Sequence, residues 1–277
     1  MALRAAIVHS NLYVAGAAAA ITAASAWEGL APGVWAWGPT VAAGCGAGCV
    51  YTLDRLAGTP SDEPQRGAMF ARRAGLLWAW AVVWAAGSVV GIALSSGPAR
   101  AALLGVAGVS LLYCLPAVRW GGRWRRLAEA PYAKGLLVAV AWALATAAAP
   151  SLDTGQDPGV AAWAAIERGL FILALTLPID LRDLAADQSF GVITPAQRWG
   201  ERGLRWACAV LLAASAAVAG MRHGPAGAWP AWAACAAGAA LVAAASTRRG
   251  PAFFAWAPDG VIWLWAGLIL VHRQALG

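Results

Sequence analysis

The chain has 277 residues, of which 61% are hydrophobic and only 12% are charged. Soluble domains carry about 25% charged residues, so this composition excludes an ordinary soluble domain and indicates an integral membrane protein. The net charge of +7 comes from basic residues dispersed among the connections, which excludes the single basic stripe of a nucleic-acid-binding surface.

Nine stretches of the chain are apolar and close to the length of a membrane-spanning helix. A span needs about 20 apolar residues, and the short connections leave no room for a soluble domain. The stretches are 5–27, 33–53, 74–96, 100–118, 134–150, 160–181, 203–221, 226–246 and 253–272. We therefore predict an all-α integral membrane protein, a bundle of nine transmembrane helices in which residues 1–277 form a single polytopic membrane domain.

The basic residues are distributed unequally between the two predicted membrane sides. If the N-terminus is cytoplasmic, the opposite side holds only Arg100, Arg168, Arg222 and Arg273, and the cytoplasmic side holds the other 16 of the 20 Lys and Arg residues. Cytoplasmic connections carry an excess of basic residues, so this orientation is predicted over its inverse. The expected location is a bacterial or archaeal cell membrane, with the N-terminus and the active site cytoplasmic.

Two connections on the predicted cytoplasmic side carry the charged side chains of a candidate site. Residues 51–66, after the second stretch, include Asp54 and Arg66, and residues 119–134, after the fourth, end at Lys134. Lys134 is the only lysine in a chain that otherwise uses arginine, which indicates a specific role for it. Both connections reach the membrane face where the sixth stretch ends, so one cavity there can hold carboxylates for a metal and cations for phosphate oxygens.

Residues 180–199 read DLRDLAADQSFGVITPAQRW and follow the sixth apolar stretch. The spacing of Asp180, Asp183 and Asp187 places three carboxylates within about a sixth of a helix circumference. Hard carboxylate oxygens suit Mg²⁺, which usually shares its coordination shell with substrate phosphates. The cluster therefore predicts a site for a metal and a diphosphate. The alternative, for aspartates mixed with arginines at the end of a span, is a solvated helix end.

At these residues the chain resembles the UbiA-type intramembrane prenyltransferase superfamily. The segment 180–195, with its three spaced aspartates followed by Thr-Pro, is similar to the second aspartate-rich motif of that family. Residues 113–135, YCLPAVRW…LAEAPYAKG, are similar to the family's connection after the fourth helix. The first aspartate-rich motif matches the family pattern only at Asp54, because Val50, Tyr51 and Gly58 stand where the other motif residues belong.

The resemblance implies a nine-helix bundle that transfers a prenyl group from a polyprenyl diphosphate to an aromatic or other lipophilic acceptor, with Mg²⁺ as the cofactor. The metal ligands that it implies are Asp54, Asp180, Asp183 and Asp187. The residues that it implies for binding the diphosphate are Arg66, Lys134 and Arg182. Asp180, Asp183 and Lys134 are the implied catalytic residues, because Lys134 and the Mg²⁺ that the two aspartates hold neutralise the negative charge that develops on the departing diphosphate.

Two other classes of function stay open. A repurposed member of the same fold, such as a terpene cyclase or a non-catalytic membrane partner, is compatible with a first motif that retains only Asp54, because a fold does not settle a function. A transporter also places ionisable groups at membrane depth. Transporters more often show broken helices or repeated halves, whereas the aspartates of this chain cluster near one interface.

Overall fold

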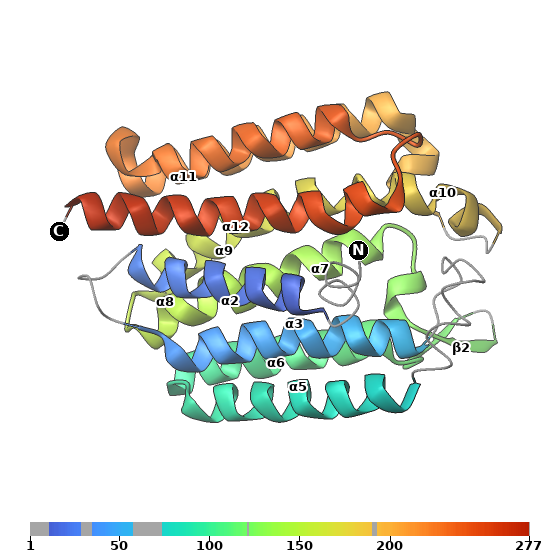
Figure 1. The fold of residues 1–277 in the computed structure, drawn as a ribbon, viewed down its shortest axis with the longest axis horizontal. Coiled ribbons are helices and arrows are strands. Elements are labelled where there is room, and N and C mark those ends of the chain that lie inside the picture. Colours follow the sequence, from blue (N-terminus) through green and yellow to red (C-terminus); the bar gives the residue numbers. More distant parts are fainter. Residues whose placement is uncertain (1–10, 29–34, 58–73, 121, 190–192, 277) are drawn as a thin grey trace.

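The computed structural model describes residues 11–28, 35–57, 74–120, 122–189 and 193–276, and its helices run along the longest axis of the molecule (Figure 1). The helices are α2 (Leu12–Trp27), α3 (Trp37–Ala57), α5 (Ala74–Leu94), α6 (Gly97–Cys114), α7 (Ala133–Ala143), α8 (Ala149–Asp153), α9 (Pro158–Thr176), α10 (Ile179–Ser189), α11 (Pro195–Ala244) and α12 (Pro251–Leu276). A π-helical turn, Leu144–Ala148, joins α7 to α8. Between α6 and α7, strands β1 (Val118–Trp120) and β2 (Arg123–Arg125) form an antiparallel hairpin, which a 3-10 turn, Leu127–Glu129, follows.

The helices confirm the predicted all-α membrane architecture. In the described part of the chain, six helices are long and apolar enough to cross a membrane by their length and composition. The predicted span at 203–221 and all but the last two residues of the span at 226–246 fall within α11, where Gly224 has a non-helical φ of 66° and ψ of 173°. Glycine adopts a positive φ without a steric penalty, so α11 consists of helical segments that meet there. The count of nine spans is not confirmed.

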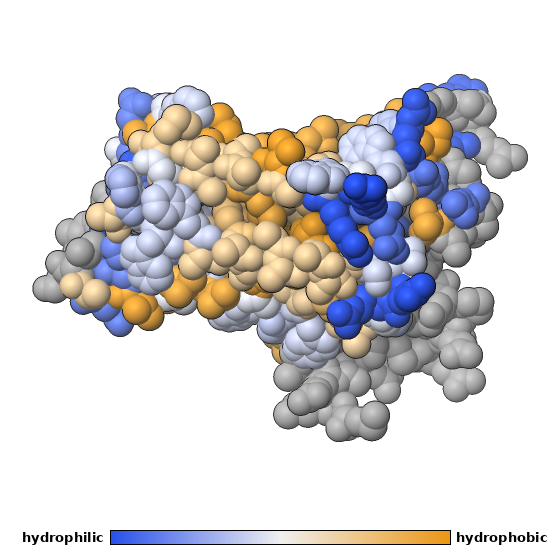
Figure 2. Space-filling view, turned by 90° about the horizontal axis from the view of Figure 1, so that it is seen from above, coloured by the Kyte–Doolittle hydropathy of each residue, from blue (hydrophilic) through white to orange (hydrophobic). Residues whose placement is uncertain are grey.

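The distribution of hydropathy on the surface agrees with a membrane-spanning bundle. Figure 2 shows apolar residues gathered over the middle of the visible face and hydrophilic residues toward both ends of the long axis. On α5, the side chains of Val82, Val89 and Leu94 are 65%, 65% and 66% exposed. Soluble proteins rarely expose large contiguous apolar patches, so these side chains face lipid.

The largest buried cluster lies where α2, α9, α11 and α12 pack together. It includes Ile21, Phe171, Leu175 and Trp265, each at most 1% exposed. The rings of Phe171 and Trp265 meet edge to face with their centroids 4.5 Å apart. This core joins α9 rigidly to its neighbours, and α9 leads directly into the predicted aspartate segment.

Helices α3 and α5 approach each other closely at a glycine. A Cβ atom added to Gly91 would meet the backbone amide nitrogen of Ala42 and would lie 2.8 Å from the carbonyl oxygen of Gly38. Both neighbours are backbone atoms, which cannot move aside as the end of a flexible side chain can. Small residues at such a position allow two membrane helices to pack backbone against backbone.

We expect Gly91→Ala to lower the stability of the protein by about 1–3 kcal/mol, because the added methyl group overpacks the contact between α3 and α5. The matched control is Gly105→Ala in α6, where an added Cβ meets nothing within 4 Å. That change should leave stability unaltered or raise it slightly, since alanine favours a helix over glycine. Thermal unfolding in detergent micelles measures both. Equal melting temperatures for the two variants would contradict this account of the packing.

Candidate functional site

The second aspartate segment lies on α10, which begins just after Pro178 interrupts the helical path from α9. Asp180 and Asp183 lie one turn apart on α10 and are 7% and 4% exposed. A buried carboxylate is costly unless it is paired and hydrogen-bonded. The structure shows how this requirement is met for Asp183.

Two basic side chains hold the carboxylate of Asp183. The guanidinium of Arg182 donates to both oxygens, from Nε to Oδ1 at 2.6 Å and from Nη2 to Oδ2 at 2.8 Å. The ammonium of Lys134 donates to Oδ2 at 3.2 Å. Both basic side chains are about one third exposed, so they are accessible from outside this group. The group can therefore attract an additional anion.

Lys134 reaches Asp183 because of the way α7 begins. Tyr132, the residue before α7, adopts a left-handed conformation with a φ of 62°. Its backbone N–H donates to the carbonyl oxygen of Ile193 at 3.3 Å, which ties the connection before α7 to the connection between α10 and α11. The first turn of α7 thereby places Lys134 beside α10. The sequence predicted that these two connections share a membrane face, and this contact joins them.

Asp54 lies near the end of α3 and belongs to a second charged group. Arg126 approaches its Oδ1 with Nη1 at 3.7 Å and pairs with Glu129 at 3.1 Å through Nε. Arg126 lies in the connection that leads into α7, whose first turn carries Lys134. Both groups therefore lie toward the same end of the bundle, where α3, α7 and α10 carry their acidic and basic residues.

The structure brings some of the predicted site residues together and leaves others outside its described part. Asp183, Lys134 and Arg182 form one bonded group, with Asp180 buried one turn away. Arg66 lies outside the described residues, and the side chain of Asp187 is also outside them. The placement of these residues stays a prediction.

The donor chemistry of this end fits a magnesium ion, although a complete ligand set is not assembled. Asp54, Asp180 and Asp183 offer hard carboxylate oxygens, the ligands that Mg²⁺ prefers. Among the residues that the structure describes, however, no three Asp, Glu, His or Cys side chains lie close enough together to hold a metal. A metal at this end would therefore need further oxygen ligands to complete its shell.

Sequence reasoning missed the role of Arg126. This residue lies in the basic run RWRR at 123–126, yet its side chain turns inward to Asp54 and is only 13% exposed. A local signal was present, because Glu129 follows Arg126 by three residues and their side chains pair. The contact with Asp54 joins residues that are far apart in the sequence, so no local sequence pattern predicts it.

The comparisons with known proteins agree with the helical arrangement. No protein-family model and no curated protein sequence matches the chain. Among solved structures, a UbiA homologue from Aeropyrum pernix without ligand aligns with a TM-score of 0.72 and 16% identity, over 94% of this chain and 98% of that one. A UbiA homologue from Archaeoglobus fulgidus bound to GPP and Mg²⁺ aligns with a TM-score of 0.65 and 15% identity, over 97% and 99%.

The same Archaeoglobus fulgidus homologue bound to DMAPP and Mg²⁺ aligns with a TM-score of 0.66 and 14% identity, over 98% of each chain. The alignments span nearly the whole length of both partners, so they compare complete bundles and not a shared fragment. The resemblance predicted from the aspartate segment is confirmed at the level of architecture. The chain has the UbiA-type fold.

Proposed function

We propose that this protein is a Mg²⁺-dependent intramembrane prenyltransferase, which transfers a prenyl group from a polyprenyl diphosphate to an aromatic or other lipophilic acceptor. The observation that carries the proposal is the buried carboxylate of Asp183 with Lys134 and Arg182 bonded to it. This group lies in a fold whose solved neighbours are described as bound to GPP, DMAPP and Mg²⁺. The combination of acidic and basic groups suits a metal together with a diphosphate.

The roles divide by charge. Mg²⁺, when bound, supplies Lewis-acid neutralisation of a leaving diphosphate. The residues proposed to hold it are Asp54, Asp180, Asp183 and Asp187. The residues proposed to bind the diphosphate oxygens are Arg66, Lys134 and Arg182. Of these, Lys134, Asp180 and Asp183 are the proposed catalytic residues.

The contacts of Asp183 indicate how the basic residues act. Without a substrate, Lys134 and Arg182 balance the buried carboxylate. Both side chains are partly exposed, so each can donate to a diphosphate oxygen while it stays near Asp183. As the allylic carbon–oxygen bond breaks, negative charge grows on the diphosphate, and prearranged donors stabilise that charge more strongly than they stabilise the ground state.

The orientation and the number of spans belong to the same proposal. We place the N-terminus and the Asp183 end of the bundle on the cytoplasmic side of a bacterial or archaeal membrane, because the basic connections collect there. The hairpin of β1 and β2 carries several of these basic residues. We also propose nine spans, with α11 contributing two that are separated at Gly224.

A repurposed member of the fold, either a terpene cyclase or a non-catalytic membrane partner, is the second candidate. The observation that favours it is the reduced first motif, in which Asp54 is the one matching aspartate and is already paired with Arg126. A cyclase would release diphosphate without forming a prenylated acceptor, and a non-catalytic partner would release no diphosphate. Product analysis therefore separates the candidates.

Binding of a prenyl diphosphate to the purified protein tests the proposal. We expect DMAPP or GPP to bind in the presence of Mg²⁺. Binding should be lost when EDTA removes the metal, because Mg²⁺ offsets the repulsion between the carboxylates and the diphosphate. Isothermal titration in detergent measures the binding, and assay of released diphosphate with a panel of aromatic acceptors measures the transfer. Binding that does not depend on Mg²⁺ would contradict the metal site, and Mg²⁺-dependent binding without transfer would favour the repurposed member.

A further inference from the structure

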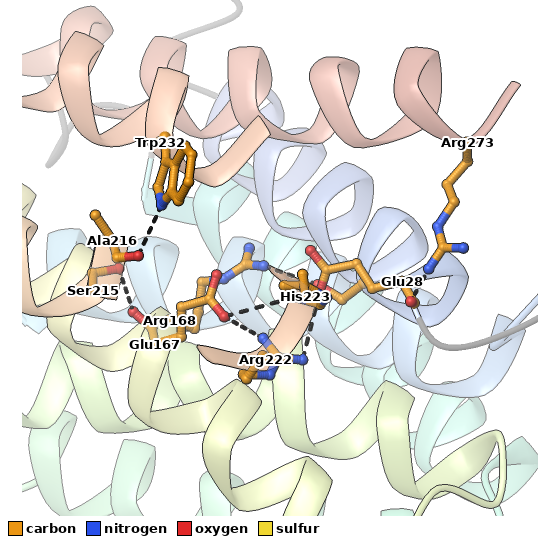
Figure 3. A network of polar contacts seen from close by, with 10 residues as sticks. Glu28, Glu167, Arg168, Ser215, Ala216, Arg222, His223, Trp232 and Arg273 are labelled. Carbon is orange, nitrogen blue, oxygen red and sulfur yellow. Dashed lines mark hydrogen bonds and ion pairs between the residues drawn. The ribbon is translucent and has the colours of Figure 1, made fainter. Parts of the chain in front are cut away.

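A second polar network lies at the end of the bundle opposite Asp183, and the proposed reaction does not use it (Figure 3). Helix α9 begins at this end and has 19 residues, about 28 Å at 1.5 Å per residue, before the chain reaches α10. Arg222 on α11 pairs with Glu167 on α9 and approaches Oε2 of Glu28, at the end of α2, with Nη2 at 3.8 Å. Ionisable residues at membrane depth mark a function more often than a simple structural contact.

The inner part of this network ties helices together. Arg168, which is 2% exposed, donates from Nη2 to Oγ of Ser25 at 3.0 Å, and its guanidinium lies 3.9 Å from the ring centroid of Trp265. Ser215 donates to the backbone carbonyl of Glu167 at 3.0 Å. These contacts join α2, α9, α11 and α12, so the inner part has a sufficient structural explanation.

The outer part of the network borders a cavity of about 420 Å³ between the start of α9 and the middle of α11. Ligand sites typically measure about 300–1,000 Å³. We call this cavity the lateral pocket. Its polar lining is Glu28, Gln156, Arg222 and His223, and its apolar lining is Val160, Trp163 and Met221.

The two linings face different environments. Val160, Trp163 and Met221 are 46%, 50% and 71% exposed on the outer surface of the bundle, where lipid is expected. In the polar part, Nε2 of Gln156 is buried without a hydrogen-bond partner among the described residues. An amphipathic ligand, with its apolar chains outside the bundle and its polar head inside, matches this arrangement.

The charges in the lateral pocket identify the head group. Glu28 and Arg222 stand side by side, and their 3.8 Å separation is longer than the roughly 2.7–2.9 Å of a charge-assisted hydrogen bond. A head group that carries both a phosphate and a primary ammonium can pair with both side chains at once. A purely anionic head would face the carboxylate of Glu28, and a quaternary ammonium has no N–H to donate to it.

We propose that the lateral pocket binds an aminophospholipid, of the phosphatidylethanolamine type, from the membrane leaflet opposite the Asp183 end. Its phosphate accepts hydrogen bonds from Arg222 and Gln156, and its ammonium donates to Glu28. Its acyl chains lie along Val160, Trp163 and Met221. This site takes no part in the proposed prenyl transfer.

Native mass spectrometry of the detergent-purified protein, titrated with phosphatidylethanolamine, phosphatidylcholine or phosphatidylglycerol of the same acyl chains, tests the proposal. We expect phosphatidylethanolamine to be retained about tenfold more than either of the others, because it alone of the three satisfies Glu28 and Arg222 together. Equal retention of phosphatidylglycerol, or of all three lipids, would overturn the proposal whatever the enzymatic activity proves to be.

Two variants assign the contacts. Glu28→Gln should remove most of the preference for phosphatidylethanolamine over phosphatidylcholine, because the amide no longer carries the negative charge that pairs with the ammonium, while the pair between Arg222 and Glu167 remains. Gln156→Leu should weaken both lipids and keep their ratio, since both carry the phosphate. The control is Asp157→Asn, in which an amide oxygen can still accept from the N–H of Gly159 at the start of α9. If the preference for phosphatidylethanolamine survived Glu28→Gln, the lateral pocket would not recognise the ammonium through Glu28.

Discussion

Asp183→Asn should lower the kcat/KM of prenyl transfer by about a thousandfold or more. Loss of a metal ligand removes several kcal/mol of stabilisation from the charge that develops on the diphosphate, and each 1.36 kcal/mol is a factor of ten in rate. Asparagine keeps the shape of the side chain and one acceptor oxygen, so Arg182 and Lys134 retain a partner at a buried position. Steady-state release of diphosphate in the presence of Mg²⁺ measures the effect.

The control for this variant is Asp157→Asn, the same chemical change at the opposite end of the bundle, where Asp157 caps α9. Its activity should equal that of the unaltered protein. The melting temperature of Asp183→Asn should also be measured, because the loss of one charge beside two cations changes the local balance. If Asp183→Asn bound prenyl diphosphate and transferred the prenyl group as well as Asp157→Asn does, the metal would lie elsewhere.

The local parts of the site could be predicted from the sequence, because helical spacing alone decides them. Asp180 and Asp183 lie one turn apart on α10, as their separation by three residues requires, and both are buried. The position of Lys134 at the start of a helix was equally local. What the sequence could not supply was the partner of each group, since Lys134 meets Asp183 across 49 residues of chain.

The parts that sequence reasoning missed depend on how distant helices pack. Arg126 belongs to a run of basic residues of the kind that contacts lipid headgroups. It pairs with Asp54 only because the connection after α6 folds over the end of α3. Glu167 lies in an apolar stretch whose average hydropathy predicted a membrane-spanning helix without a special role for its charged residues. It is buried because Arg222 of α11 reaches it, 55 residues later in the chain. In both cases tertiary packing decides whether a charged residue faces lipid, water or another charge.

The division of α11 shows a similar limit. The two apolar stretches at 203–221 and 226–246 were separated in the sequence by Gly224 and Pro225, which favour a break. In the structure, helical segments of α11 meet at Gly200 (φ 62°, ψ 179°) and at Gly224 (φ 66°, ψ 173°), the two residues of α11 whose backbone angles depart from helical values. A glycine next to a proline therefore marks where the path of α11 changes, whereas the number of membrane crossings depends on how its segments are placed in the bilayer.

Lys134→Met should raise the KM for prenyl diphosphate by about tenfold to a hundredfold and also lower kcat, because Lys134 is proposed both to bind the diphosphate and to stabilise the charge that grows on it. A hydrogen bond to a charged group contributes about 1.5–3 kcal/mol, and methionine retains the apolar stem of the side chain while it removes the ammonium. Asp183 keeps both hydrogen bonds from Arg182, so the fold at this point is preserved. Lys134→Arg should recover part of the affinity, since it restores the charge with a different geometry.

The control for the charge itself is Arg125→Met, which also removes one cation from the predicted cytoplasmic face but lies on the exposed hairpin strand β2. If general electrostatic attraction to the basic face brought the diphosphate to the protein, both variants would raise KM equally and added salt would remove the difference from the unaltered protein. A direct contact predicts a large effect for Lys134→Met alone, persisting in salt. The ratio of the two KM values therefore decides whether Lys134 binds the substrate or only contributes to the field around it.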